Sequence, residues 1–300
     1  VQSSAEENKI NSVDIFIFRN TSPTSEDYQK LDTYKRVISP QNGSIEVSTT
    51  TGPKTICVLI NDHGSNFTGV TTLEKFRKIV TKLQSEKLSD FTMYGEAYAT
   101  LGTESSVAIT VQRFISKIEL KSVSTKFSGT PYSGMSLTNC KLFLVNAHGD
   151  KIVYNNTPTA NPTIMNYKKL VGEDVNGCAE EELLAEILSV GITDVPMTTS
   201  HCFYTYSNIT DNIEESTKLV LQGDLDGVTY YYPIPINQKG YGLDDSGTDG
   251  GVGRNTYYSY GIVVTRPGSL DPNIPLVPGT LELSLSVTDW VVVPTFEKTF

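Results

Sequence analysis

An all-β protein with two domains is the architecture that the sequence predicts, and three observations lead to it. The chain has 300 residues, more than one small core needs. Hydrophobic residues make up 38% of it, enough for globular cores, and Thr, Ser, Tyr and Val are prominent. Long amphipathic helical patterns are scarce, whereas alternation of apolar and polar residues recurs. We therefore expect packed β-sheets with a few short helices.

The stretch from Ser105 to Val123 organises the predicted fold. Val107, Ile109 and Val111 occupy odd positions and alternate with less apolar residues, as in a half-buried strand. After Gln112 the apolar residues change to even positions. A bulge or a change of sheet re-aims side chains in this way. We expect a long strand that passes from one sheet to another.

The first half of the chain contains further strand patterns and one helical pattern. Residues 13–18 are apolar at both parities, which favours a strand near the middle of a sandwich. Residues 20–40 read as a loop with a short edge strand, and 44–48 and 55–60 as strands. Thr71 and Glu74 have capping-box spacing, and apolar residues follow at steps of three and four, so a helix is predicted over 71–87.

The second half begins after a stretch rich in Ser, Gly and Pro at 122–136. A boundary there gives expected domains at residues 1–124, which include the helix 71–87, and 125–300. A short helix is predicted at 180–190 from its apolar side. Strands are predicted at 137–145, 152–154, 197–206, 218–225, 227–236, 255–266 and 281–288.

Charge and hydropathy exclude several classes of function. The net charge of −10 and the pI near 4.9 argue against nucleic-acid binding, which needs clustered Lys and Arg. No run of 18 apolar residues exists, and the first residues, VQSSAEENK, lack the features of an export signal. We expect no nucleic-acid partner and no membrane-spanning segment.

Catalytic and metal-binding motifs are sparse. His63, His148 and His201 lie in or beside loops with no nucleophile motif nearby, so we expect no enzyme and no cofactor. The loop 244–250, DDSGTDG, offers oxygens for calcium but lacks the EF-hand order, and a solvated loop is the simpler interpretation. Catalytic, cofactor and metal residues are therefore expected to be absent.

The four cysteines are far apart in sequence. Cys57 and Cys140 lie in strand patterns and are expected to be buried thiols. Cys178 with Cys202 is the one pairing worth testing, although a pair of free thiols is favoured. The Tyr clusters at 230–232 and 257–258 allow a glycan-binding platform, but half-buried strand positions explain them more simply.

The octapeptide Arg113-Phe-Ile-Ser-Lys117-Ile-Glu-Leu carries a resemblance to a known family. It is similar to the R-x-x-A-K-hydrophobic strand of the fimbrillin family, the type V pilin subunits of Bacteroides-type bacteria, with Ser116 in place of the usual Ala. Other pieces follow in the family's order, namely residues 10–18, Met93-Tyr-Gly-Glu, Arg254-Asn255 with 257–260, and Asp289-Trp290.

The resemblance implies two consecutive transthyretin-like β-sandwich domains in a subunit of a bacterial surface fimbria that supports adhesion. Family members are exported lipoproteins, so a membrane partner enters only through a lipid anchor on the precursor, and the expected location is the fimbrium and outer membrane. A protease removes the first strand in the family; here the expected cut lies just before Val1. The partners implied are copies of the chain or related pilins, with a host glycan or protein as a further candidate receptor.

Strand donation is the assembly mechanism that the resemblance implies. The expected donor is the segment 291–300, VVVPTFEKTF, in which Val292, Phe296 and Phe300 share a parity and can enter a groove. Two alternatives stay open. One is a tip or anchor subunit of the same fibre, and the other is a monomeric carbohydrate-binding surface lipoprotein, which the Tyr clusters would serve.

Overall fold

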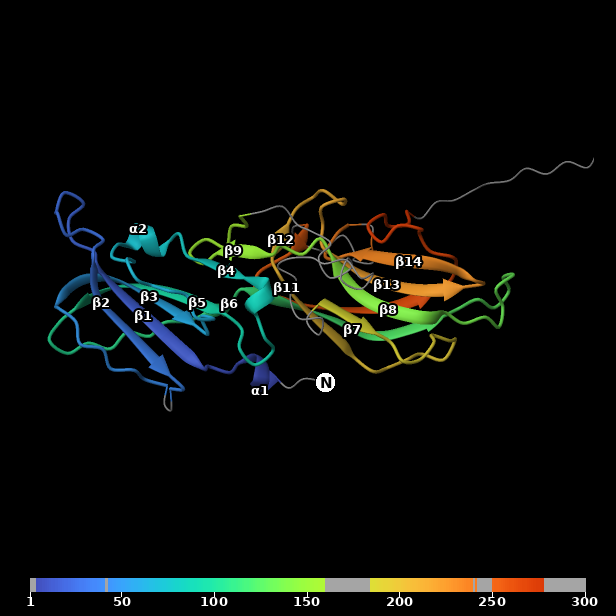
Figure 1. The fold of residues 1–300 in the computed structure, drawn as a ribbon, viewed down its shortest axis with the longest axis horizontal. Helices are drawn as coiled ribbons and strands as arrows, with labels where there is room; N and C mark the ends of the chain where they lie inside the picture. Colours follow the sequence, from blue (N-terminus) through green and yellow to red (C-terminus); the bar gives the residue numbers. More distant parts are fainter. Residues whose placement is uncertain (1–3, 41–42, 160–183, 240, 242–249, 278–300) are drawn as a thin grey trace, which may run out of the picture.

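Strands gather toward both ends of an elongated molecule in the computed structural model, which describes residues 4–40, 43–159, 184–239, 241 and 250–277 (Figure 1). At one end lies a five-stranded antiparallel sheet. Its strand order is β2 (Leu31–Ile38), β1 (Ser12–Arg19), β3 (Gly52–Ile60), β5 (Met93–Leu101) and β6 (Gln112–Arg113).

Strand β1 carries apolar side chains on both faces, as its sequence predicts. Phe16 and Phe18 point into the large core, where Phe16 packs 4.9 Å, centroid to centroid, from Phe76. Val13, Ile15 and Ile17 belong to a second apolar cluster on the opposite face. A central strand, paired on both sides, is where such a two-faced sequence can bury all of its apolar surface.

The chain changes sheets at Phe114, within the stretch predicted to do so. β6 pairs with β5 in the five-stranded sheet, and β7 (Ile115–Thr125) then pairs with β11 (His201–Tyr206) and, in parallel, with β16 (Tyr257–Val264). Residues 105–111 alternate in exposure as predicted but belong to no ladder in the described part of the chain. β7 therefore begins the strand group at the other end (Figure 1).

A four-stranded antiparallel sheet completes that end, in the order β10 (Ala185–Ile187), β8 (Thr138–Val145), β13 (Lys218–Leu225) and β14 (Val228–Pro235). Two short pairs join β12 (Asn208–Ile209) to β15 (Gly251–Val252), and β4 (Val80–Lys82) to β9 (Asp150–Ile152). One large core cluster includes residues from both ends, among them Phe16, Phe114 and Leu219. The division into domains 1–124 and 125–300 stays a prediction.

The predicted helix over 71–87 is wrong in extent. α2 (Leu73–Phe76) is a single turn capped by Thr72, whose side chain accepts a hydrogen bond from the Lys75 amide. The chain then forms β4 and a 3₁₀ turn, η1 (Leu83–Ser85). The β-branched residues in 79–81 favour a strand over a helix, because their side chains are restricted in a helix. Pairing of β4 with β9 then satisfies the backbone of this stretch.

The short helix predicted at 180–190 is wrong over 185–187, which form β10 along the edge of β8; Leu184 is helical, and 180–183 lie outside the described residues. Residues 44–48 are extended but unpaired, and the strand predicted at 281–288 lies outside the described residues. α1 (Ser4–Glu7) precedes β1. No helix in the described part of the chain is long and apolar enough to cross a membrane.

Candidate functional site

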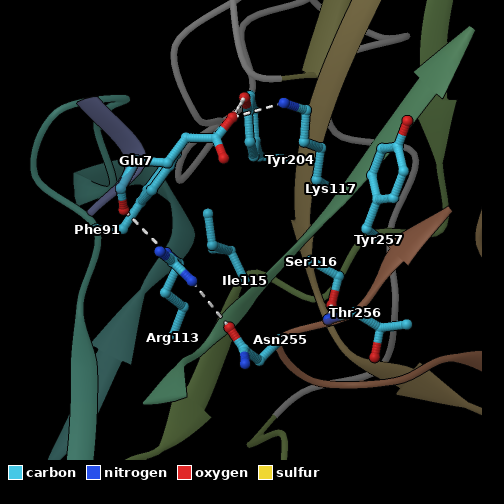
Figure 2. Close-up of a pocket in the computed structure, with 10 residues that line it drawn as sticks. All are labelled: Glu7, Phe91, Arg113, Ile115, Ser116, Lys117, Tyr204, Asn255, Thr256 and Tyr257. Carbon is cyan, nitrogen blue, oxygen red and sulfur yellow. Dashed lines mark hydrogen bonds and ion pairs between the residues drawn. The ribbon is translucent and has the colours of Figure 1, made fainter. Parts of the chain in front are cut away.

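A cavity of about 290 Å³ lies where the chain passes from one sheet to the other. Figure 2 shows its walls, which come from α1, from β6 and β7, from β11 and from the start of β16. The lining residues are Glu7, Phe91, Arg113, Ile115, Ser116, Lys117, Tyr204, Asn255, Thr256 and Tyr257. Both residues of the family-like strand motif, Arg113 and Lys117, therefore meet in one place.

Glu7 is the centre of the hydrogen bonding in this cavity. Its Oε1 accepts from Lys117 Nζ at 2.6 Å and from the Tyr204 hydroxyl at 2.7 Å. Its backbone carbonyl accepts from Arg113 Nε at 2.9 Å. The contacts attach the amino-terminal segment to strands β6, β7 and β11 (Figure 2).

Arg113 also reaches two amide side chains. One Nη donates to Asn255 Oδ1 at 3.1 Å, and the other donates to Asn8 Oδ1. No carboxylate pairs with Arg113 in the described part of the chain, so its charge is balanced only by dipoles. Burial lowers the pKa of Lys117 while the hydrogen bond to Glu7 raises it, and the net shift is upward. Two cations thus face one carboxylate.

Arg254 fixes the wall that carries Asn255. Its guanidinium lies 4.1 Å from the centre of the Phe114 ring and donates to the carbonyls of Arg113 at 2.9 Å and Gln112 at 2.7 Å. Burial lowers the pKa of Arg254 to about 10. Asn255 has a φ of +53°, in the left-handed region that Asn tolerates better than most residues, and this turn aims its amide at Arg113.

A second feature is one face of the five-stranded sheet, formed by Val13, Ile15 and Ile17 of β1 with Ile56 and Ile60 of β3. These residues keep 3–7% exposure, whereas Phe16 and Phe18 on the other face keep 1% and 0%. We call this surface the β1–β3 face. Two extended stretches, the flanking segments 44–50 and 105–111, contribute half-buried apolar side chains to the same cluster.

The flanking segments lie toward opposite edges of the β1–β3 face. Lys35 and Thr33 of β2 donate to the carbonyls of Glu46 and Ser48, so segment 44–50 follows β2. Segment 105–111 crosses β5 at Gly95, where an added Cβ would lie 2.4 Å from the Thr110 carbonyl oxygen. Among the described residues, neither segment forms a backbone-to-backbone hydrogen bond. In segment 44–50 the Glu46 and Ser48 carbonyls and the Thr50 amide are bound by side chains of β2, so the other backbone groups of the two segments are the ones left for another strand.

The histidines are dispersed. His63 Nδ1 lies 3.3 Å from Asp90 and its Nε2 lies 3.6 Å from Glu86, while His201 Nδ1 lies 2.7 Å from Glu186. In the described part of the chain, no three His, Cys, Asp or Glu side chains are grouped to hold a metal ion. The loop 244–249 lies outside the described residues, so the expectation of a solvated loop without a metal stays a prediction.

The remaining sequence candidates have mixed outcomes. Cys57 and Cys140 are buried free thiols, as predicted, and Cys178 lies outside the described residues. The tyrosines at 230–232 are in β14 and those at 257–258 in β16, which belong to different sheets. Of these two clusters, Tyr257 is the member that lines the cavity. Val1, Val292, Phe296 and Phe300 lie outside the described residues, and their roles in processing and strand donation stay predictions.

Sequence reasoning missed Glu7 and Tyr204 as site residues. Glu7 lies 110 positions from Lys117 and 197 from Tyr204. A single Glu in a polar amino-terminal stretch carries no periodic or motif signal, and Tyr204 reads as one more strand aromatic. Only the fold brings them to the Arg113 strand.

Comparisons with known proteins place the chain beside fimbrial and cell adhesion proteins. Residues 2–165 match the model of the family described as major fimbrial subunit protein (FimA). Two solved structures of candidate cell adhesion proteins are similar, one from Parabacteroides distasonis (TM-score 0.66, 18% identity, 93% of this chain and 87% of that chain) and one from Bacteroides eggerthii (0.66, 20%, 90% and 85%).

A fimbrilin (FimA) from Porphyromonas gingivalis is also similar in structure, with a TM-score of 0.58 and 16% identity over 89% of this chain and 87% of that chain. At these identities the structural likeness shows the fold alone. No curated protein sequence matches the chain significantly.

Proposed function

The chain belongs to the family of major fimbrial subunit proteins (FimA), and we propose that it polymerises by accepting a strand from a neighbouring copy on its β1–β3 face. Family membership gives the coarser conclusion directly: this is a structural subunit of a cell-surface fimbria. In the proposal, proteolysis removes a strand that precedes β1, and a donor from the next subunit takes its place. The contact is head-to-tail, and repeated contacts of this kind build a filament.

The observation that carries the proposal is the pair of flanking segments. They run in extended conformation on one face of a sheet, they alternate in exposure, and among the described residues their backbone amides and carbonyls pair with no other backbone group. The residues of both segments are half-buried or exposed, so water can serve their unpaired backbone groups until a strand ladder replaces it. A strand lying between the segments would supply that ladder on both sides.

Access to the face requires the flanking segments to separate, because the residues of β1 and β3 beneath them keep only 3–7% exposure. Separation breaks no strand ladder within the described residues. It uncovers side chains such as Ile45 and Val107, which are half-buried and can close again over a donor. In the proposal, the two flanking segments move apart over the β1–β3 face, and the donor strand that enters between them forms regular sheet.

Val292, Phe296 and Phe300 are the donor side chains that we propose to enter the face. Burying three such side chains contributes roughly 5 to 9 kcal/mol before ordering costs. The new backbone ladder adds to this, since it pairs groups that are otherwise left to water. Slow exit of a fully paired strand then supports a durable fibre.

Deletion of residues 291–300 tests the donor. We expect a folded monomer that no longer forms filaments after protease treatment, as seen by electron microscopy and size-exclusion chromatography. Val292→Asp should have the same effect because it places a charge against the β1–β3 face. Its matched control is Val291→Asp, at the opposite parity, which should polymerise normally. Normal filaments from the deletion variant would show that the donor lies elsewhere.

A further inference from the structure

We propose that the cavity at Arg113 binds a single acidic sugar residue, and that the subunit therefore carries a glycan site separate from the β1–β3 face. The ligand class follows from three properties of the walls: net charge, hydrogen-bonding groups and an exposed aromatic ring. Figure 2 shows Arg113, Asn255 and Tyr257 among the residues that line this cavity.

The charge in the cavity calls for an anion. Lys117 and Glu7 neutralise each other across 2.6 Å, whereas the partners of Arg113 among the described residues are a carbonyl and two amide oxygens. The lining residues therefore sum to one positive charge, in a chain whose net charge is −10. Within the described part of the chain, two of the five guanidinium N–H groups have no acceptor and remain for a ligand, and Arg recognises carboxylates through such paired donors. The cavity therefore suits a ligand with a single carboxylate.

Further groups in the walls suit hydroxyls rather than a bare carboxylate. Asn255 uses its Oδ1 for Arg113, so its Nδ2 can donate to a ligand. The Glu7 carboxylate has a second oxygen that can accept from a hydroxyl, since both of its side-chain contacts fall on Oε1. An amide, a carboxylate and a cation around one space form the usual polar set for a ring with several hydroxyls.

Tyr257 supplies an apolar surface at the mouth of the cavity. Its side chain is 52% exposed, and its hydroxyl donates to Glu119, which holds the ring in place. A fixed aromatic ring provides contact area at little entropic cost, and sugar rings stack on such faces. The volume of about 290 Å³ is at the lower end for ligand pockets and suits one sugar residue.

The test compares methyl glucuronide with methyl glucoside, which differ at the carboxylate, by isothermal titration calorimetry at low salt. We expect the glucuronide to bind at least tenfold more tightly. Arg113→Gln should remove this preference, and Tyr257→Ala should weaken the binding of both ligands about fivefold. The control is Lys78→Gln, which removes one positive charge, as Arg113→Gln does, but at an exposed position away from the cavity. It should leave the affinities for both ligands unchanged. Acetate at the same concentration should not compete.

Arg113 also joins the two ends of the molecule, so its variant can fail to fold, and circular dichroism melting checks this. If Arg113→Gln does not fold, Asn255→Asp is the variant to use in its place. The new carboxylate beside Arg113 cancels the positive charge of the cavity and leaves the arginine present, so the preference for the glucuronide should disappear. No saturable glucuronide binding, equal binding of the two glycosides, or an unchanged preference in Asn255→Asp would each overturn the proposal. Full competition by acetate would overturn its sugar component.

Discussion

At the scale of single residues, one fully buried carboxylate links the two strand groups. Glu86 accepts hydrogen bonds from the Tyr206 hydroxyl of β11 at 2.7 Å and from the Thr92 amide at 2.8 Å. His63 lies at the edge of this network, between Glu86 and Asp90. Such a network stabilises the fold only while each member keeps its partner. The charge of His63 therefore bears on stability.

We expect His63 to make the protein more stable in mild acid than in mild alkali. Burial lowers the pKa of His63, but the nearby Glu86, Asp90 and Asp62 raise it by more than burial lowers it. The pKa in the folded state therefore lies above the ordinary value. The stabilisation is complete below the unfolded-state pKa of about 6.5 and is lost as pH rises through the folded-state pKa. Urea midpoints measured from about pH 5.5 to 8.5 should fall for the wild type relative to His63→Gln.

Asp90→Asn is the control for this pH effect, because it removes one of the anions that raise the pKa of His63. The difference between wild type and His63→Gln should shrink in its background. Equal pH dependence of the wild type and His63→Gln would contradict the assignment and would mean that other groups carry the acid response.

Residue-level features differ in how far the sequence reveals them. Arg113 and Lys117 are predicted from a motif, and the two-faced burial of Phe16 and Ile17 from parity alone, because both signals are local. Glu7 is invisible in the sequence, since its partners lie more than 100 positions away. The cavity therefore becomes apparent only when strands from three regions are assembled.

At the scale of elements, the helix predicted over 71–87 shows how a distant partner overrides a local pattern. Leu73, Phe76 and Leu83 are all buried at helical spacing, so the periodic signal is real. The intervening Thr81 is buried as well, and its hydroxyl bonds to the Tyr206 hydroxyl at 3.0 Å. Pairing of β4 with β9, about 70 residues away, decides the conformation, and sequence periodicity does not report it.

Gly95 tests the packing of flanking segment 105–111 on β5. A Cβ there would lie 2.4 Å from the Thr110 carbonyl oxygen and 2.9 Å from Ile109 Cγ2. Gly95→Ala should therefore push the segment away from β5 and lower the free energy of unfolding by about 1–3 kcal/mol. Chemical denaturation measures the loss, and hydrogen exchange at 105–111 should increase.

Gly43→Ala is the matched control, since no atom lies within 4 Å of the added Cβ at that position. It should stay within about 0.5 kcal/mol of the wild type. If Gly95→Ala were equally silent, the segment would rest further from β5 than the structure places it. The proposed opening of the β1–β3 face would then lack one of its two covering segments.

At the scale of the whole molecule, the continuous core opposes independent unfolding of the two ends. Phe114 is fully buried where the chain changes sheets, and the same cluster contains Phe18 from one end and Leu221 from the other. β4 pairs with β9 across the same region. Two sandwich domains joined only by a linker would show neither feature, because separate domains keep separate cores.

We expect Phe114→Ala to destabilise both ends together. Removal of this ring leaves a cavity in the shared core and removes the surface on which Arg254 stacks, at a cost of about 3–5 kcal/mol. Hydrogen exchange should then show a similar loss of protection in peptides from β1 and β3 and in those from β8 and β13. Ile187→Ala, at an exposed position on β10, is the control and should leave both groups unchanged. Loss confined to β1 and β3 would mean that the two ends unfold separately, and a filament under load could then yield within a subunit and not only between subunits.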